Sequence, residues 1–231
     1  MPAALRHCWM ISTRLPDDER ALRADPDLVE KWVMGWTVAR QTPSPVRDSG
    51  AYRIDVGLPD HKMRYVFDRC SEDIRRLAKR ISEPNVFIKV CSPPEPVLAL
   101  LPLRWENQTL GYMMTRALEP ASEPLMPKGY RLVFESSPPR LHAVISDAKG
   151  ALVARGGAAL VDGLAVFDQI RTHEAHRRRG LARAVMTVLQ RGALVLGIRQ
   201  GALVATPEGR ALYDAMGWKL HCLYTRLAIP A

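Results

Sequence analysis

The segment from residue 164 to residue 216 most constrains the fold, because strand-like and helix-like patterns alternate along it. "LAVFDQIRT" (residues 164–172) has the composition of a strand. Apolar residues then recur at positions 181, 184, 185, 188 and 189, which is the spacing of an amphipathic helix. "GALVAT" (residues 201–206) is typical of a short buried strand, and Thr206-Pro207-Glu208 predicts the start of a second helix. The alternation indicates an α+β fold.

Further strands surround this segment. Residues 130–136 and 141–147 are strand-like, and "AKG" forms a turn into a third strand that ends at an Asp-Gly turn. After the second helix, "WKLHCLYTRLAI" closes the chain as one or two strands. We therefore expect a mixed, mostly antiparallel sheet flanked by helices.

The first half of the chain repeats part of this order. The elements predicted there are a helix, two strands, a helix and a strand, over residues 25–40, 51–57, 62–68, 71–81 and 85–90. A proline-rich stretch, residues 118–129, separates the halves. We expect an N-terminal α/β domain of residues 1–120, a linker of residues 121–129 and a C-terminal domain of residues 130–231.

The two halves differ in charge. Residues 1–120 carry 18 Lys and Arg against 16 Asp and Glu, whereas residues 121–231 carry 15 against 8, and 12 of those 15 are arginines. Because arginine makes forked contacts with phosphate, we expect an anionic partner on the second half. A nucleic acid is disfavoured, since no helix-turn-helix, zinc-finger or aromatic stacking motif accompanies the charge.

Other function classes lack their sequence signals. The four cysteines have no paired spacing, and no cysteine or second acidic ligand accompanies His173 and His176, so we predict reduced thiols and no metal site. No apolar run approaches the roughly 18 residues of a membrane helix. Residues 1–11 do not have the pattern of a signal peptide. We expect a cytoplasmic protein that does not bind a membrane.

The turn at residues 177–182, Arg-Arg-Arg-Gly-Leu-Ala, has the features of an anion site. A helix N-terminus has unsatisfied N–H groups and partial positive charge. Three arginines at that end oppose the helix dipole, a mismatch that a bound anion would offset. Gly180 and Ala182 are small, so a ligand can approach the backbone closely. A solvated helix end is the plainer alternative.

This turn resembles the R/Q-x-x-G-x-G/A motif of the GNAT superfamily of N-acetyltransferases. The order around it is also similar, since a strand precedes the turn and a helix, a strand and a second helix with a tyrosine follow it. "ATPEGRALYDAMGW" (residues 205–218) looks like the family's second signature. The resemblance covers residues 130–231 and implies a GNAT-like fold. It also implies that acetyl-CoA (coenzyme A as the acyl carrier) is the cosubstrate and that a primary amine of a small molecule or protein attacks it directly.

The resemblance implies a role for individual residues. The backbone of Arg177, Arg178, Arg179, Gly180, Leu181 and Ala182 would hold the pyrophosphate. Ile170 and Thr172 would pair with the pantetheine arm as an added strand would. Tyr213 would protonate the departing thiolate, the alternative being a helix residue that only packs on the sheet.

Two questions stay open at this stage. The general base stays open: the family's strand glutamate corresponds to Ala165 here, and the nearest acids, Asp162 and Asp168, do not clearly match it. Asp168 and Glu174 are possible bases, and a water-relayed base is the alternative. The two helices that open a GNAT domain are missing from the second half. Either the first half supplies them, making one domain of all 231 residues, or the first half is a degenerate copy in a tandem. The second explanation is favoured by the repeated order of elements.

The function that we expect is N-acyl transfer, with acetyl-CoA, an unidentified amine acceptor and a second copy of the chain as candidate partners. Two rival classes stay open: a non-catalytic CoA-binding sensor and a basic module that binds nucleic acid or another anion.

Overall fold

The computed structural model of the protein describes residues 22–230. The strands are β1 (Val46–Asp48), β2 (Ala51–Leu58), β3 (His61–Phe67), β4 (Val86–Val90), β5 (Glu106–Asn107), β6 (Gly111–Ala117), β7 (Tyr130–Ser137), β8 (Arg140–Asp147), β9 (Leu152–Val161), β10 (Leu164–Thr172), β11 (Gln200–Ala205) and β12 (Lys219–Ala228). The helices are α2 (Pro26–Arg40), α3 (Glu72–Arg80), α4 (Pro94–Leu98), α5 (Leu181–Val195) and α6 (Pro207–Asp214), with a short 3-10 helix at Glu174–His176.

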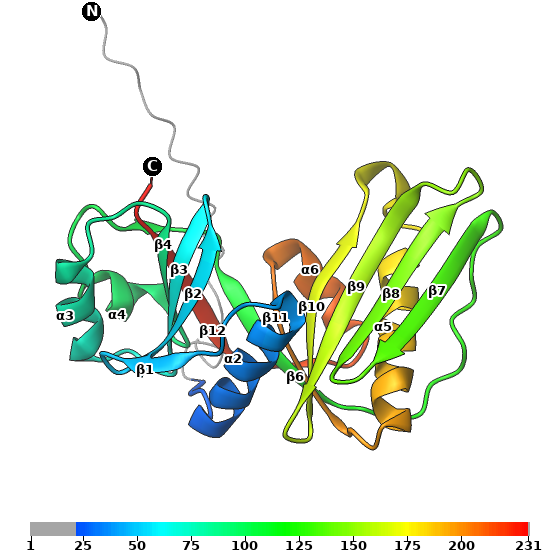
Figure 1. Cartoon of the computed structure of the whole chain (residues 1–231), viewed down its shortest axis with the longest axis horizontal. Helices are drawn as coiled ribbons and strands as arrows, with labels where there is room; N and C mark the ends of the chain where they lie inside the picture. The colour runs from blue at the N-terminus through cyan, green and yellow to red at the C-terminus, as the bar shows by residue number, and fades with distance from the viewer. Residues whose placement is uncertain (1–21, 231) are drawn as a thin grey trace, which may run out of the picture.

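All these strands form one sheet in the order β1-β2-β3-β4-β12-β6-β11-β10-β9-β8-β7, with β5 also paired to β12 (Figure 1). Two neighbouring pairs, β3–β4 and β10–β11, are parallel, and the other pairs in the sheet are antiparallel. The expectation of a mixed, mostly antiparallel sheet flanked by helices is confirmed. Each parallel pair is joined by a helix, since α3 connects β3 to β4 and α5 connects β10 to β11.

The same unit therefore occurs twice. In the first half, the antiparallel pair β2–β3 leads through α3 to β4; in the second half, β9–β10 leads through α5 to β11. This repeated topology is the one expected of a tandem whose first half is a degenerate copy. At the turn of the first half, α3 begins with Ser71, Glu72 and Asp73 where α5 begins after Gly180. Acidic side chains at this position disfavour an anion.

The two halves exchange their last strands. β6, which ends the first half, pairs with β11 of the second half, and β12, which ends the second half, pairs with β4 of the first. Residues 118–127, between β6 and β7, contain no helix or strand. The boundaries at residues 120 and 130 stay a prediction. The centre of the sheet, β4-β12-β6-β11, is therefore built from strands of both halves.

Helix α2 lies on one face of the sheet and α5 on the other. The side chain of Val166 on β10 packs with α2, whereas the neighbouring Ala165 packs in the core that contains α5, as the alternation along a strand requires. A side chain at Gly35 would collide with Val166, so the absence of a side chain there lets α2 approach β10 closely. A helix of the first half thus covers a strand of the second half. The sequence pattern predicted no helix within the second half that could cover this face.

Three cysteines, Cys70, Cys91 and Cys222, have free thiols as expected. Cys8 and the expectation for residues 1–11 lie outside the described residues. Between residues 22 and 230, no helix is long and apolar enough to cross a membrane.

Candidate active site

β10 and β11 separate after a short stretch of pairing. Their parallel register covers Leu164 to Val166 on β10 and Gln200 to Ala202 on β11. Beyond Val166, β10 stays paired to β9, with a bulge between Asp168 and Arg171. Gln169 lies within this bulge in the left-handed region, at φ 58°. One edge of β10 is therefore left without a neighbouring strand on the β11 side.

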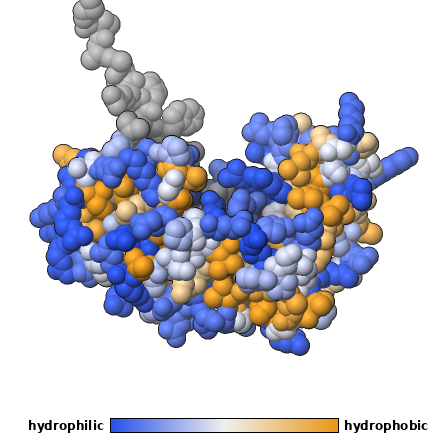
Figure 2. All heavy atoms as spheres, viewed as in Figure 1, coloured by the Kyte–Doolittle hydropathy of each residue, from blue (hydrophilic) through white to orange (hydrophobic). Residues whose placement is uncertain are grey.

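A cavity of about 290 Å³ lies where the two strands separate. Both strands line it, together with α2, α6, β3 and β12. The lining residues that enter the argument below are Trp32, Trp36, Arg40, Arg64, Phe167, Asp168, Ile170, Arg171, Tyr213, Tyr224 and Arg226. Hydrophilic residues dominate the hollow between the two lobes of the molecule in Figure 2.

In the turn after β10, no side chain covers the backbone at Gly180, as an anion site requires. Gly180 caps α5 at φ 76°, and a Cβ built on it would meet no atom within 4 Å. Arg178 is also left-handed, at φ 63°. The first N–H groups of α5 have no acceptor within the helix. The open space at Gly180 leaves these N–H groups accessible from outside the helix.

The three arginines of the turn make different contacts. Arg177 donates to the Thr172 carbonyl at 3.4 Å and pairs with Glu174 at 3.5 Å. Arg179 donates to the Tyr130 hydroxyl at 2.9 Å. Arg178 makes no hydrogen bond or ion pair within residues 22–230, which leaves its guanidinium available to a ligand.

Tyr130 of β7 contacts this turn, and the sequence motif did not indicate this contact. Its hydroxyl also lies 2.9 Å from Nδ1 of His176, so it connects the 3-10 helix to Arg179. This contact depends on the pairing of distant strands, and no local spacing predicts it. The contacts of Tyr130 with His176 and Arg179 hold the segment just before α5 against β7.

Of the two strand residues expected beside a pantetheine arm, Ile170 lines the cavity and Thr172 does not. Thr172 pairs with Ala154 of β9, and its hydroxyl is buried with no hydrogen-bond partner within residues 22–230. The open edge of β10 has the geometry that an added strand requires.

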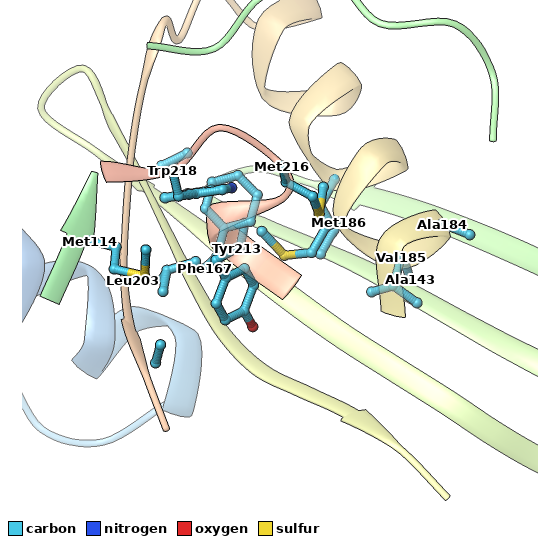
Figure 3. Close-up of a cluster of buried hydrophobic side chains, with 14 of the residues drawn as sticks. Met114, Ala143, Phe167, Ala184, Val185, Met186, Leu203, Tyr213, Met216 and Trp218 are labelled. Carbon is cyan, nitrogen blue, oxygen red and sulfur yellow. The ribbon is translucent and has the colours of Figure 1, made fainter. Parts of the chain in front are cut away.

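Tyr213 lines the cavity from α6 and belongs to the hydrophobic core as well (Figure 3). Its side chain is 8% exposed, and its ring meets Trp218 edge-on at 6.1 Å. Burial, with a smaller contribution from the Asp168 carboxylate, raises the pKa of Tyr213 well above its usual value. The phenol therefore keeps its proton through the neutral range. This burial accounts for the packing role, and the raised pKa makes the phenol a weaker acid, so the role of proton donor stays a prediction.

Comparisons with known proteins bear on the fold. No protein-family model matches the sequence, and no curated protein matches it either. Solved structures do match. A GCN5-related N-acetyltransferase from Kribbella flavida aligns at a TM-score of 0.62 and 14% identity, over 85% of this chain and 93% of that one.

Two further structures agree. A GCN5-related N-acetyltransferase from Sphaerobacter thermophilus aligns at a TM-score of 0.55 and 15% identity, over 79% of this chain and 78% of that one. A tandem GNAT protein from the clavulanic acid biosynthesis pathway aligns at 0.50 and 15% identity, over 67% and 66%. The chain has the GNAT fold. The fold expected from the turn at residues 177–182 is thereby confirmed, over more of the chain than the motif covers.

The wall of this GNAT cavity opposite α6 was missed by the sequence interpretation. α2 contributes Trp32, Trp36 and Arg40, which are four residues apart and so share one helix face. Arg64 comes from β3 and Arg226 from β12. The spacing on α2 could have indicated a common face. Nothing local indicates that this face meets β3 and β12.

The two candidate acids lie in different environments. Asp168 lines the cavity, and both of its carboxylate oxygens accept hydrogen bonds from Arg40, at 2.6 and 3.2 Å. Glu174 is exposed beside Arg177 and does not line the cavity. Across residues 22–230, no group of three or more His, Cys, Asp or Glu side chains comes together that could hold a metal ion.

Proposed function

We propose that this protein is an N-acyltransferase that moves the acetyl group of acetyl-CoA to a primary amine. The observation that carries the proposal is the separation of β10 from β11 around a cavity, with the bare Gly180 turn at the end of β10 and Tyr213 beside the opening. The GNAT fold of solved acetyltransferases supports it. A cytoplasmic location belongs to the same proposal.

The chain's own residues divide the work. The backbone at Gly180 to Ala182 binds the pyrophosphate, and Arg178 adds a full positive charge. The open edge of β10 at Ile170 orients the pantetheine arm. Bound acetyl-CoA supplies an activated thioester. Tyr213 holds the proton that the leaving sulfur takes up.

In the reaction, the amine nitrogen forms a bond to the acetyl carbon while the carbon–sulfur bond breaks. The sulfur leaves with the electron pair and accepts the Tyr213 proton, and the nitrogen loses its own proton to a base. Asp168 is the carboxylate that lines the cavity, where it pairs with Arg40, and it is one candidate for this base. Water in the cavity is the alternative base.

Calorimetric titration of the purified protein with acetyl-CoA tests the proposal. We expect one site per chain and a dissociation constant in the micromolar range, on the order of 1 to 100 μM. Absence of heat and of any shift in melting temperature would remove the proposal. Binding without release of free thiol, across a panel of amines, would instead identify a CoA-binding sensor. A salt-dependent DNA mobility shift without CoA binding would favour the nucleic-acid module.

Tyr213→Phe separates a proton donor from a packing residue. The ring stays in the core, so the affinity for acetyl-CoA should change by no more than about twofold, whereas turnover should fall by roughly 100-fold because the leaving sulfur loses its acid. Steady-state kinetics and calorimetry measure the two effects. Trp218→Phe is the control, since Trp218 packs in the same core away from the cavity lining. Equal losses of turnover in both variants would assign Tyr213 to packing.

A further inference from the structure

The cavity wall opposite α6 has an excess of positive charge. Four arginines line the cavity, Arg40, Arg64, Arg171 and Arg226, against a single carboxylate among the described lining residues, that of Asp168. Arg40 already binds Asp168. The other three have no ion pair with a carboxylate anywhere in residues 22–230.

Arg64 has a buried nitrogen that no acceptor of the described chain satisfies. Its guanidinium stacks on the Trp36 ring, 3.9 Å from the centroid, and its Nε is buried without a hydrogen-bond partner within the described chain. Burial, with smaller contributions from Arg40 and Arg226, lowers the pKa of Arg64 to about 10, although Tyr224 and Asp168 act in the opposite direction. A buried donor without an acceptor is unfavourable unless a ligand provides the acceptor.

Arg226 lies opposite a buried lysine on the neighbouring strand. It is paired across β12 and β4 with Lys89, whose pKa is lowered by burial and, to a smaller extent, by Arg64 and Arg226. Arg226 Nε donates to the Thr109 carbonyl at 2.6 Å, which fixes its side chain. Arg64 and Arg226 thus both contribute positive potential at this wall, and an anion beside them would be stabilised.

The same wall has flat apolar surfaces. The Trp32 and Trp36 rings line the cavity next to the arginines, and Tyr224 lines it with a buried hydroxyl that has no partner within residues 22–230. A volume of about 290 Å³ is at the lower end of pockets that hold small molecules. The occupant should therefore be small, with an apolar part and an anionic group.

We propose that the acyl acceptor is a small amine that carries an anionic group, a carboxylate or a phosphate, which Arg64 and Arg226 bind. The inference rests on the proposed acyl transfer. The amine then faces the opening between β10 and β11, and the anionic group lies on the α2 side of the cavity. Polyamines and other cationic acceptors are disfavoured by the unpaired arginines.

Matched probe pairs test the charge requirement without any turnover. N-acetyl-L-leucine is compared with N-acetyl-L-leucinamide, and N-acetylphosphoethanolamine with N-acetylethanolamine, by calorimetry and ligand-observed NMR. We expect the charged member of at least one pair to bind at least about tenfold more tightly than its neutral partner, because a charge-assisted hydrogen bond is lost in the neutral one. The preferred pair distinguishes a carboxylate from a phosphate. Equal affinities, or no binding of any probe up to about 10 mM, would overturn the inference.

The corresponding free amines separate this inference from the proposed function. Leucine, leucinamide, phosphoethanolamine, ethanolamine and spermidine are compared by thiol release from acetyl-CoA. Faster reaction of a charged-group amine than of its neutral partner supports the inference. If leucinamide or spermidine reacts as efficiently as leucine or phosphoethanolamine, the proposed acyl transfer is retained and the inference of an anionic acceptor is overturned. Failure of acetyl-CoA to bind would remove the proposed function itself, and with it the acceptor role.

Variants of Arg64 locate the effect. Arg64→Met should reduce the preference for the charged probe from at least about tenfold to less than about twofold, and Arg64→Lys should restore part of it. Acetyl-CoA affinity should stay within about twofold, because Arg64 does not lie on the turn. Arg131→Met, an exposed arginine of β7, is the matched control and should keep the full preference.

A second position guards against a folding defect. If Arg64→Met does not fold, as judged by circular dichroism, Arg226→Met takes its place. A folded Arg64→Met or Arg226→Met variant that keeps the whole preference would overturn the assignment of the anion to these arginines.

Discussion

Replacing Gly180 with glutamate should weaken acetyl-CoA binding by at least about 100-fold. Gly180 is at φ 76°, where an L side chain costs roughly 1 to 2 kcal/mol, and the free space beside it is the space that the ligand needs. A carboxylate there also repels the pyrophosphate at close range. The two effects together correspond to about 2.7 kcal/mol, which is the 100-fold change. Calorimetric titration of the variant measures it.

Gly57→Glu is the matched control. Gly57 lies on β2 at φ 74° and also has nothing within 4 Å of a built Cβ, so backbone strain and free space are the same as at Gly180. Its affinity for acetyl-CoA should remain at the wild-type value. A loss in both variants would point to general destabilisation, and unchanged binding by Gly180→Glu would show that the anion site is elsewhere. Gly180→Ala isolates the strain from the charge and should lose about tenfold or less.

The elements with their own periodicity could be predicted from sequence. On β8, Leu141, Ala143 and Ile145 are buried and the residues between them are more exposed, which is the alternation of a strand with one covered face. β6 could not be predicted in this way. Its residues Gly111 to Met114 are buried on both faces, because Tyr112 and Met114 pack in one hydrophobic core and Met113 packs in another. The exchange of β6 and β12 depends on long-range pairing that no local window contains.

The two walls of the cavity also differ in how far the sequence alone predicts them. The Gly180 turn and Tyr213 belong to a continuous segment whose order of elements resembles a known family, so that segment could be interpreted from sequence alone. The opposite wall combines side chains from α2, β3 and β12, and its charge excess exists only once these elements meet. Arg64, taken alone, is typical of the exposed face of a half-buried strand. Its environment depends on Trp36, which lies 28 positions earlier and stacks on it.

Replacing Lys89 with methionine should raise the free energy of unfolding at pH 7, on the order of 5 kcal/mol, which is about 1.4 kcal/mol for each pH unit between 7 and the unfolded pKa of 10.5. Lys89 is 5% exposed, its ammonium lies 4.3 Å from the centroid of the Phe87 ring, and burial lowers its pKa to about 6 with help from Arg64 and Arg226. An unfolded chain holds the lysine proton up to about pH 10.5. Between about pH 6 and 10.5 the unfolded state therefore binds one proton more than the folded state, and wild-type stability rises with pH.

This sign gives the prediction a pH signature that a packing change would not have. The advantage of Lys89→Met should shrink by up to ~1.4 kcal/mol for each pH unit between about 7 and 10, because the wild type recovers stability as its unfolded state loses the proton. Urea unfolding at pH 7, 8 and 9 measures the slope, and Lys79→Met, an exposed lysine of α3, should show none. A constant difference would mean that Lys89 is charged and hydrated in the folded protein. If an anionic acceptor binds beside Arg226, saturating ligand should raise the pKa of Lys89 and flatten the slope, which connects this measurement to the charge of the cavity.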